Sequence, residues 1–322
     1  MMTPTPTYRQ IAVTAPECAE LLTKSAAPLA PRQVAGPTVV TLVSAGTELA
    51  SCYTAKQDFP RCPGYAAIFR VTEIGAEVSD LAPGALAFCM GPHASWQQVE
   101  RDALLPVPDG LAPEQAVCAR LMSVSMSTLT TTSARPPAPI AVTGLGPVGH
   151  FAAQIFQSAG YDVLAVDPQP ARQADARRAG IRRVAAALPE DGDFALVAEC
   201  SGHEQAVLDA CRCVRKGGEV ALIGVPWARK TDLLAFDILH AVFHRYVYLR
   251  SGWEWEVPLH AEPFRQNSIF GQLAGAMRWL AEGRIMLDGL ATHYAAAQAQ
   301  EVYQTLLQRR NERLLALFDW GD

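Results

Sequence analysis

A glycine-rich run in the middle of the chain has the spacing of a turn that binds phosphate. It follows the apolar segment 140–143, precedes an apolar segment with helical periodicity, and consists of Gly144, Leu145, Gly146, Pro147, Val148 and Gly149. The first glycine permits a tight turn, the second lets a phosphate approach the backbone, and the third allows the helix to pack closely on the strand. Free N–H groups at the start of that helix favour an anion. The pattern predicts a dinucleotide site.

An acidic residue stands where such a site needs one. Asp167 ends the next apolar segment, 163–166, roughly 20 residues after the first glycine, and its carboxylate could accept both hydroxyls of a ribose. A carboxylate at this position repels a 2′-phosphate, which favours NAD(H) and leaves NADP(H) as the second choice. Arg172 is expected either to reach the adenosine ribose or a phosphate, or to be a solvated helix residue.

The composition restricts the classes of function. The chain has 322 residues and a net charge of -5, with no run of Lys and Arg, so nucleic acid is not an expected partner. No apolar stretch reaches the ~18 residues of a membrane span. The first ten residues do not resemble a secretory signal, and the eight cysteines are scattered without a CxxC pair. We therefore expect reduced thiols, a cytoplasmic location and no zinc knuckle.

Two different patterns divide the chain. Residues 1–120 read as short β-segments punctuated by Pro and Gly, whereas apolar strands and helices alternate from about 121 to 252. Such alternation is typical of a parallel sheet with crossover helices. A mixed pattern follows in 253–322, with a helix around 269–281. We expect an α/β protein with a β-rich first domain and a dinucleotide-binding domain over 121–252.

Several motifs spread over nearly the whole chain resemble the medium-chain dehydrogenase/reductase superfamily. They are VSAGTELA (43–50), CPGYA (62–66), GLGPVG (144–149), IGVP (223–226), LDGLATH (287–293) and NERLLALF (311–318). The resemblance implies a GroES-like β-barrel catalytic domain over 1–120, a Rossmann domain with a doubly wound parallel sheet over 121–252, and a return to the catalytic domain over 253–322. VSAGTELA and FCMGPHASW (88–96) are most similar to the branch of bacteriochlorophyllide a dehydrogenase-like or threonine-dehydrogenase-like proteins.

This sequence departs from the superfamily where zinc-dependent members hold their catalytic metal. Ala45 and Tyr65 occupy the positions of a Cys and a His ligand, and Cys118 is the one candidate near the third position, at Arg120. Alanine has no donor atom, and a neutral tyrosine is a poor zinc ligand. The four-Cys lobe that holds structural zinc is also absent. We expect a zinc-free member with no metal site.

The same comparison points to three candidate catalytic residues. Tyr65 replaces the lost histidine, and its phenol could donate a hydrogen bond to a developing alkoxide; Thr47 matches the hydroxyl of a proton relay. The alternatives are a packed barrel aromatic for Tyr65 and a turn residue bonded to its own backbone for Thr47. His93 lies in a turn that lines the substrate pocket of relatives, and it is either an acid or base or a turn histidine bonded to backbone.

The resemblance also assigns further cofactor contacts. Arg313 matches a position whose guanidinium binds the pyrophosphate. Two strand ends, which contain Cys200 with Ser201 and Gly224 with Val225, are expected beside the nicotinamide. His150 could contact a phosphate or only pack, and His240 with His244 is more consistent with a solvated helix face than with a metal site. The edge segment 246–249 is the expected homodimer contact.

The expected function is that of a zinc-independent NAD(P)(H)-dependent oxidoreductase. It would transfer hydride between nicotinamide and a small carbonyl, imine, activated alkene or secondary alcohol. Two alternatives stay open. One is a nucleotide-binding relative without redox turnover, and the other is a secondary-alcohol dehydrogenase of the bacteriochlorophyllide type.

Overall fold

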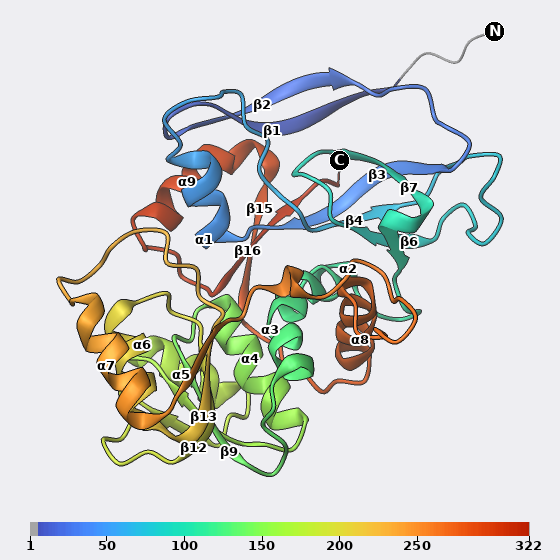
Figure 1. The fold of residues 1–322 in the computed structure, drawn as a ribbon. Helices are drawn as coiled ribbons and strands as arrows, with labels where there is room; N and C mark the ends of the chain where they lie inside the picture. Colours follow the sequence, from blue (N-terminus) through green and yellow to red (C-terminus); the bar gives the residue numbers. More distant parts are fainter. Residues whose placement is uncertain (1–5, 322) are drawn as a thin grey trace, which may run out of the picture. The chain divides into compact units, whose positions relative to one another are not determined.

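A computed structural model describes residues 6–321 and divides into two compact units (Figure 1). Unit 1 contains residues 1–120 and 289–322, and unit 2 contains residues 121–288. The expectation for the extreme N-terminus falls partly on residues 1–5, which lie outside the described residues. Within residues 6–321, no helix has the length and apolar character needed to cross a bilayer.

Unit 1 is built on a mainly antiparallel sheet with a separate hairpin beside it. The first part of the chain supplies β1 (Thr7–Ala15), β2 (Cys18–Ser25), β3 (Gln33–Leu42), α1 (Ala45–Glu48), the single-turn π-helix η1 (Leu49–Tyr53), β4 (Ala67–Arg70), β5 (Glu73–Ile74), β6 (Leu86–Cys89), β7 (Trp96–Glu100), the 3-10 turn η2 (Arg101–Ala103), β8 (Leu104–Pro106) and α2 (Pro113–Ala116). The last part adds β15 (Ala291–Ala295), the 3-10 turn η4 (Ala296–Gln298), α9 (Ala299–Leu307) and β16 (Leu315–Asp319).

The central strand of unit 1 is β3, which is long and rich in β-branched residues. In the described chain the sheet order is β15-β16-β3-β4-β6-β8, with β5 and β7 also paired to β3. Strand β16 is buried along Leu315–Phe318 and pairs antiparallel with β3. The C-terminal segment thus completes the sheet that the N-terminal segment begins, and β1 and β2 form a hairpin of their own.

Unit 2 is a parallel sheet covered by helices. Its elements are α3 (Ala119–Thr131, of which 121–131 belong to this unit), β9 (Pro139–Thr143), α4 (Pro147–Ser158), β10 (Asp162–Val166), α5 (Pro170–Arg178), β11 (Arg183–Ala185), β12 (Phe194–Glu199), α6 (Glu204–Cys213), β13 (Val214–Leu222), α7 (Ala235–Arg245), β14 (Tyr248–Ser251), the 3-10 turn η3 (Glu254–Glu256) and α8 (Ile269–Ala281). The order β11-β10-β9-β12-β13-β14 reverses direction between β9 and β12, as in a doubly wound sheet.

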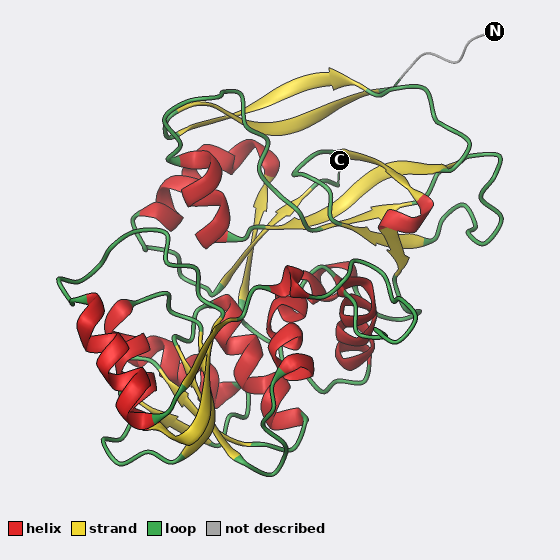
Figure 2. Ribbon diagram, in the orientation of Figure 1, coloured by secondary structure: helices red, strands yellow, loops and turns green. Residues whose placement is uncertain are grey.

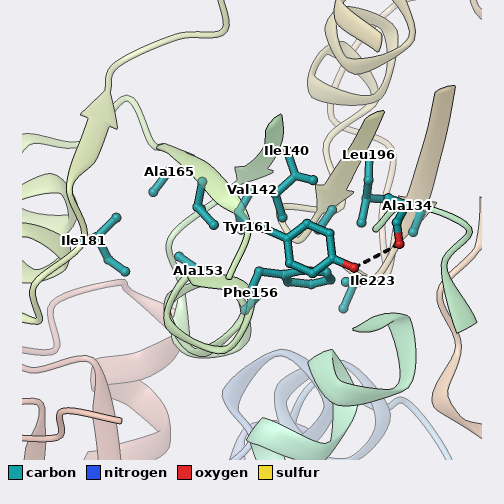
Figure 3. Packing of buried hydrophobic residues seen from close by; sticks show 14 of the residues in the cluster. Ala134, Ile140, Val142, Ala153, Phe156, Tyr161, Ala165, Ile181, Leu196 and Ile223 are labelled. Carbon is teal, nitrogen blue, oxygen red and sulfur yellow. Dashed lines mark hydrogen bonds between the residues drawn. The ribbon is translucent and has the colours of Figure 1, made fainter. Parts of the chain in front are cut away.

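Helices lie on both faces of this sheet (Figure 2), and each face has its own apolar core. One core is centred on α4 and includes Phe156 and Tyr161; the other contains residues of α6 and α7. The Tyr161 hydroxyl donates to the carbonyl oxygen of Ala134 over 2.9 Å (Figure 3), so its one polar atom is satisfied inside the first core. The α/β class predicted from the sequence is confirmed.

One domain boundary differs from the expectation. Residues 253–288 belong to unit 2, and the chain rejoins unit 1 only at Gly289. The reason lies in α8, because the buried Gln272 of this helix accepts a hydrogen bond from Ser127 of α3 over 2.7 Å. Just before α8, Asn267 donates to Thr130 over 2.8 Å. The predicted helix over 269–281 is therefore present, but it extends unit 2.

Candidate functional site

The glycine-rich turn lies between β9 and α4, and it is shaped to leave backbone donors open. Gly144 has a φ of +80°, and a Cβ there would lie 2.7 Å from that of Ser201. A Cβ on Gly146 would meet no atom within 4 Å. Helix α4 begins at Pro147 with no side chain capping its first turn. Helix α4 has 12 residues, and the space beside Gly146 lets a ligand approach the backbone at the start of this helix. This arrangement fits a pyrophosphate.

Asp167 joins this turn to the end of β10. Its two carboxylate oxygens accept hydrogen bonds from the backbone N–H groups of Leu145 and Gln169, each over 2.8 Å. Each oxygen retains a second lone pair for a ribose hydroxyl. Arg172 on α5 is partly buried, and burial lowers its pKa while the charges of Asp167 and Asp175 oppose that shift. These residues therefore fit the adenosine half of a dinucleotide.

The residues expected near the nicotinamide follow β12 and β13. Ser201 donates through both its backbone N–H and its hydroxyl to the fully buried Glu199, and the Gly202 N–H donates to the same carboxyl over 3.0 Å. Gly224 and Val225 come directly after β13 and Ile223, and the Gly224 N–H donates to the Glu199 carbonyl oxygen over 2.7 Å. Glu199 thus fixes the turns at both strand ends, although the sequence analysis gave it no role.

Cys200, which lies between Glu199 and Ser201, is not a nucleophile. Burial raises the pKa of its thiol well above the ordinary value, and the charge of Glu199 raises it further. The thiolate is the reactive form of cysteine, so this side chain stays a neutral thiol. Cys200 is retained as a residue that shapes the predicted nicotinamide region.

His150 is fully buried on the first turn of α4, and neither of its ring nitrogens has a hydrogen-bond partner. Burial lowers its pKa to about 4, although the nearby Asp175 opposes this shift. The ring is therefore neutral near neutral pH and packs near Phe151 with a centroid distance of 6.4 Å. Of the two alternatives for His150, its burial favours packing.

In unit 1, three hydroxyl groups gather beside α1. The Tyr65 hydroxyl donates to the Ser44 hydroxyl through a short hydrogen bond, and Thr47 Oγ1 lies 3.5 Å from the same phenol oxygen. All three side chains are half-buried. Burial raises the pKa of Tyr65, and its hydrogen bonds to Ser44 and Thr47 oppose that shift. The structure thus brings Tyr65 and Thr47 together and adds Ser44, which the sequence analysis did not single out.

A buried carboxylate holds Ser44 in place. Glu48 Oε1 accepts the Ser44 backbone N–H over 2.7 Å, and Oε2 accepts the Tyr303 hydroxyl over 2.6 Å and the His93 ring over 2.9 Å. Burial raises the pKa of Glu48, but attraction to His93 and these hydrogen bonds outweigh burial and lower it overall. Glu48 is therefore an ionised carboxylate with donors on both oxygens, which is how a buried charge is tolerated.

His93 belongs to this buried cluster. Its side chain is fully buried, with Nε2 on Glu48 and Nδ1 2.8 Å from Thr41 Oγ1. A carboxylate only accepts, so Nε2 carries the proton in the contact with Glu48. Thr41 also accepts from Trp320 Nε1 over 3.0 Å. Of the two alternatives for His93, its full burial argues against an acid or base that faces substrate, and its ring is bonded to side chains in the core rather than to the backbone of the turn.

The side chains near Tyr65 do not fit the zinc ion that zinc-dependent members of the superfamily hold. Burial raises the pKa of Cys118 to about 12, and the carboxyl of Glu48 is already surrounded by donors. The guanidinium of Arg120 lies 4.7 Å from the centre of the Tyr65 ring. The positive charge of this guanidinium would repel a zinc ion bound at Tyr65. Among the described residues, no group of three His, Cys, Asp or Glu side chains could hold a metal ion.

The remaining candidates lie elsewhere. Arg313 is exposed just before β16 in unit 1, whereas the other predicted cofactor contacts are in unit 2. His240 and His244 lie one turn apart on α7, with their ring centres 4.2 Å from each other. Among the described residues, no third His, Cys, Asp or Glu side chain lies where it could bind a metal ion together with them. This arrangement is consistent with the solvated helix face expected for them.

Comparison with known proteins finds similar dehydrogenases. A family model described as zinc-binding dehydrogenase matches residues 147–253. Sorbitol dehydrogenase of Bacillus subtilis (strain 168) is 24% identical over 243 residues, which cover 70% of this chain and 62% of that protein. The chain matches slightly less than two thirds of the length of the first curated relatives.

Solved structures share the fold over nearly the whole chain. Acetophenone reductase from Geotrichum candidum NBRC 4597, in complex with NAD, has a TM-score of 0.80 at 15% identity and covers 99% of this chain and 98% of its own. A protein from Sinorhizobium meliloti 1021 bound to NADP has a TM-score of 0.78 at 16% identity, covering 98% and 99%. Together with the glycine turn and the two-unit organisation, these similarities agree with the sequence motifs that resemble the medium-chain dehydrogenase/reductase superfamily.

Proposed function

We propose that this protein is an NAD(P)(H)-dependent oxidoreductase that works without zinc and uses Tyr65 as its proton donor. The observation that carries the proposal is the Tyr65 hydroxyl bonded to Ser44 beside Thr47, in a chain that also has an open glycine turn for a dinucleotide. The substrate class is a small carbonyl, imine, activated alkene or secondary alcohol. A bound nicotinamide would supply or accept the hydride.

The residues of unit 1 account for the proton. In the direction of reduction, the Tyr65 phenol donates its proton to the substrate oxygen as negative charge develops there, and the phenol is left as a phenolate. The Ser44 hydroxyl, which accepts from Tyr65 before the step, can then turn its own hydrogen toward the phenolate. Thr47 extends this chain of hydroxyls, and Glu48 fixes the Ser44 backbone. Oxidation of an alcohol uses the same steps in reverse.

Asp167 supports NAD(H) as the preferred cofactor. Its carboxylate is held at the end of β10 by two backbone N–H groups and still has lone pairs for ribose hydroxyls. The partly buried Arg172 supplies a positive charge near Asp167 that could bind the 2′-phosphate of NADP(H), so NADP(H) is the second choice. We further propose a cytoplasmic protein, because its eight cysteines are all free.

A homodimer through the edge of the parallel sheet completes the proposal. In the described chain, β14 is the last strand of the sheet and pairs only with β13. Tyr246 and Tyr248 are 66% and 57% exposed beside this edge, and unpaired strand edges with exposed aromatic residues favour association. Tyr248→Lys should shift the protein toward monomer in sedimentation, whereas Phe264→Lys, at an exposed aromatic outside the strand, should not. A wild-type monomer at micromolar concentration would contradict the dimer.

The activity is tested in two steps. Nucleotide fluorescence should show binding of NADH, NADPH or both to the purified protein, and failure of both to bind would contradict the proposal. The protein is then assayed against ketones, aldehydes, enones and imines with the reduced cofactor, and against secondary alcohols with the oxidised one. Turnover of one of these classes is expected. Tight binding without turnover across the panel would instead indicate a nucleotide-binding protein without redox activity.

A further inference from the structure

A buried arginine beside Tyr65 has no place yet in the proposed chemistry. Arg120, the last residue of unit 1, is only 3% exposed, and its guanidinium lies over the Tyr65 ring at 4.7 Å from the ring centre. The positive charge of Arg120 therefore lies directly over the ring on which a Tyr65 phenolate would form. Tyr65 is also the residue whose hydroxyl contacts the hydroxyls of both Ser44 and Thr47.

We propose that Arg120 is the positioning residue that makes Tyr65 an effective proton donor, because its fixed positive charge stabilises the phenolate left after the proton has gone. This inference rests on the proposed function, in which Tyr65 donates the proton. The bond that breaks is the O–H bond of Tyr65, the bond that forms joins that proton to the substrate oxygen, and the electron pair stays on the phenol oxygen. Arg120 itself touches neither substrate nor proton.

The charges around Tyr65 support this direction of effect. Burial disfavours the phenolate, and so does the negative charge of Glu48 on α1. Arg120, at the start of α3, is the nearby positive charge, and the hydrogen bonds to Ser44 and Thr47 act in the same sense as Arg120. If the charge of Arg120 were removed, burial and the negative charge of Glu48 would both disfavour the phenolate of Tyr65. Of these two charged groups, Arg120 is the one that favours the phenolate.

The test measures the ionisation of Tyr65 without any substrate. Difluorotyrosine, whose phenol is more acidic than that of tyrosine, is placed at position 65 of the full chain, and its fluorine resonance is followed against pH. Arg120→Met should raise the midpoint of this titration by about one pH unit or more, at least tenfold in the ionisation constant, as expected for a charge about 5 Å away at an effective dielectric constant of about 20. Arg120→Lys should recover most of the change.

Two further variants make the result decisive. Arg120→Gln removes the charge but keeps amide donors, so it replaces the Met variant should that one fail to fold. Arg61→Met is the matched control, because Arg61 is a partly buried arginine of unit 1 that donates to the Ser51 carbonyl oxygen over 2.7 Å. An unchanged midpoint in a folded Met or Gln variant would overturn the role of Arg120.

The same variants separate this inference from the proposed function. With an active substrate, loss of the Arg120 charge should move the pH profile of kcat in parallel with the fluorine titration. If Tyr65→Phe leaves turnover intact, Tyr65 is not the proton donor, and a shifted titration would then show an electrostatic contact without catalytic use. That outcome overturns the inference as well, but it is distinguishable from an unchanged titration.

Discussion

Glu48 holds Ser44 at two points: its carboxylate accepts the Ser44 backbone N–H over 2.7 Å, and its own backbone N–H donates to the Ser44 carbonyl oxygen over 2.9 Å. Ser44 in turn accepts the Tyr65 hydroxyl. A buried charge in the core of unit 1 therefore fixes the first acceptor of the proposed proton chain.

Glu48→Gln should destabilise the protein by roughly 2 kcal/mol or more, because hydrogen bonds to a charged group are lost in a buried cluster. The pKa of Glu48 is lower in the folded protein than its ordinary value of 4.5. Its contribution to stability is therefore present above pH 4.5 and is lost as the pH falls through the folded pKa. Urea unfolding should show the wild-type advantage shrinking below about pH 4.5. The exposed Glu73→Gln is the control, and equal stability of the Glu48 variant at neutral pH would contradict this role.

His150 should make the stability of unit 2 depend on pH. Its pKa is lowered to about 4 by burial, so the unfolded chain binds a proton at a higher pH than the folded one. Stability should consequently fall as the pH drops from about 6.5 toward 4, by roughly 2 kcal/mol between pH 7 and pH 5 for this group alone. His150→Leu should reduce that fall and stabilise the protein, because two unpaired buried nitrogens are removed. Identical pH dependence of urea unfolding in both proteins would count against it.

Asp167→Asn should change the cofactor preference. The amide oxygen can still accept a backbone N–H, but the negative charge that repels a 2′-phosphate is gone. We expect NADH to bind about tenfold more weakly and the ratio of NADPH to NADH affinity to rise, as measured by nucleotide fluorescence. Asp175→Asn on α5 is the control. An unchanged ratio would remove Asp167 from the ribose site.

Metal analysis tests the altered donor set. The resemblance places Ala45 and Tyr65 at the positions of two zinc ligands, and Arg120 adds a positive charge beside Tyr65, so the purified protein should carry less than about a tenth of a zinc ion per chain. Chelators should leave its activity unchanged. Stoichiometric zinc would require a different interpretation of this site, beginning with the histidines.

The fold was more accessible from the sequence than the site. Helix α8 could be placed because 269–281 has helical periodicity in its apolar residues, yet its domain was misassigned. The turn-rich, tryptophan-containing segment before it resembles a domain boundary, and only the contacts of Gln272 and Asn267 with α3 show otherwise. The residues of the glycine turn and Asp167 could be found because their spacing is local.

The Glu48 cluster could not be predicted in the same way. Glu48, His93 and Tyr303 come from three distant segments, and nothing in the local pattern around any of them indicates the other two. His93 consequently stayed open between a pocket residue and a turn histidine bonded to backbone, and Glu48 was missed altogether. The one available signal was an acidic residue one turn after Ser44 in a mostly apolar stretch, which is compatible with a capping contact.

The measurement that bears most directly on Tyr65 as the proton donor is the turnover of Tyr65→Phe, set beside its nucleotide affinity. Removing the hydroxyl should lower kcat by ~10²-fold or more and leave NAD(P)H binding intact, the usual result of losing a general acid. Tyr161→Phe, which loses a buried hydroxyl in unit 2, should keep its turnover. Full activity in Tyr65→Phe would contradict the assignment and return Tyr65 to a packing role.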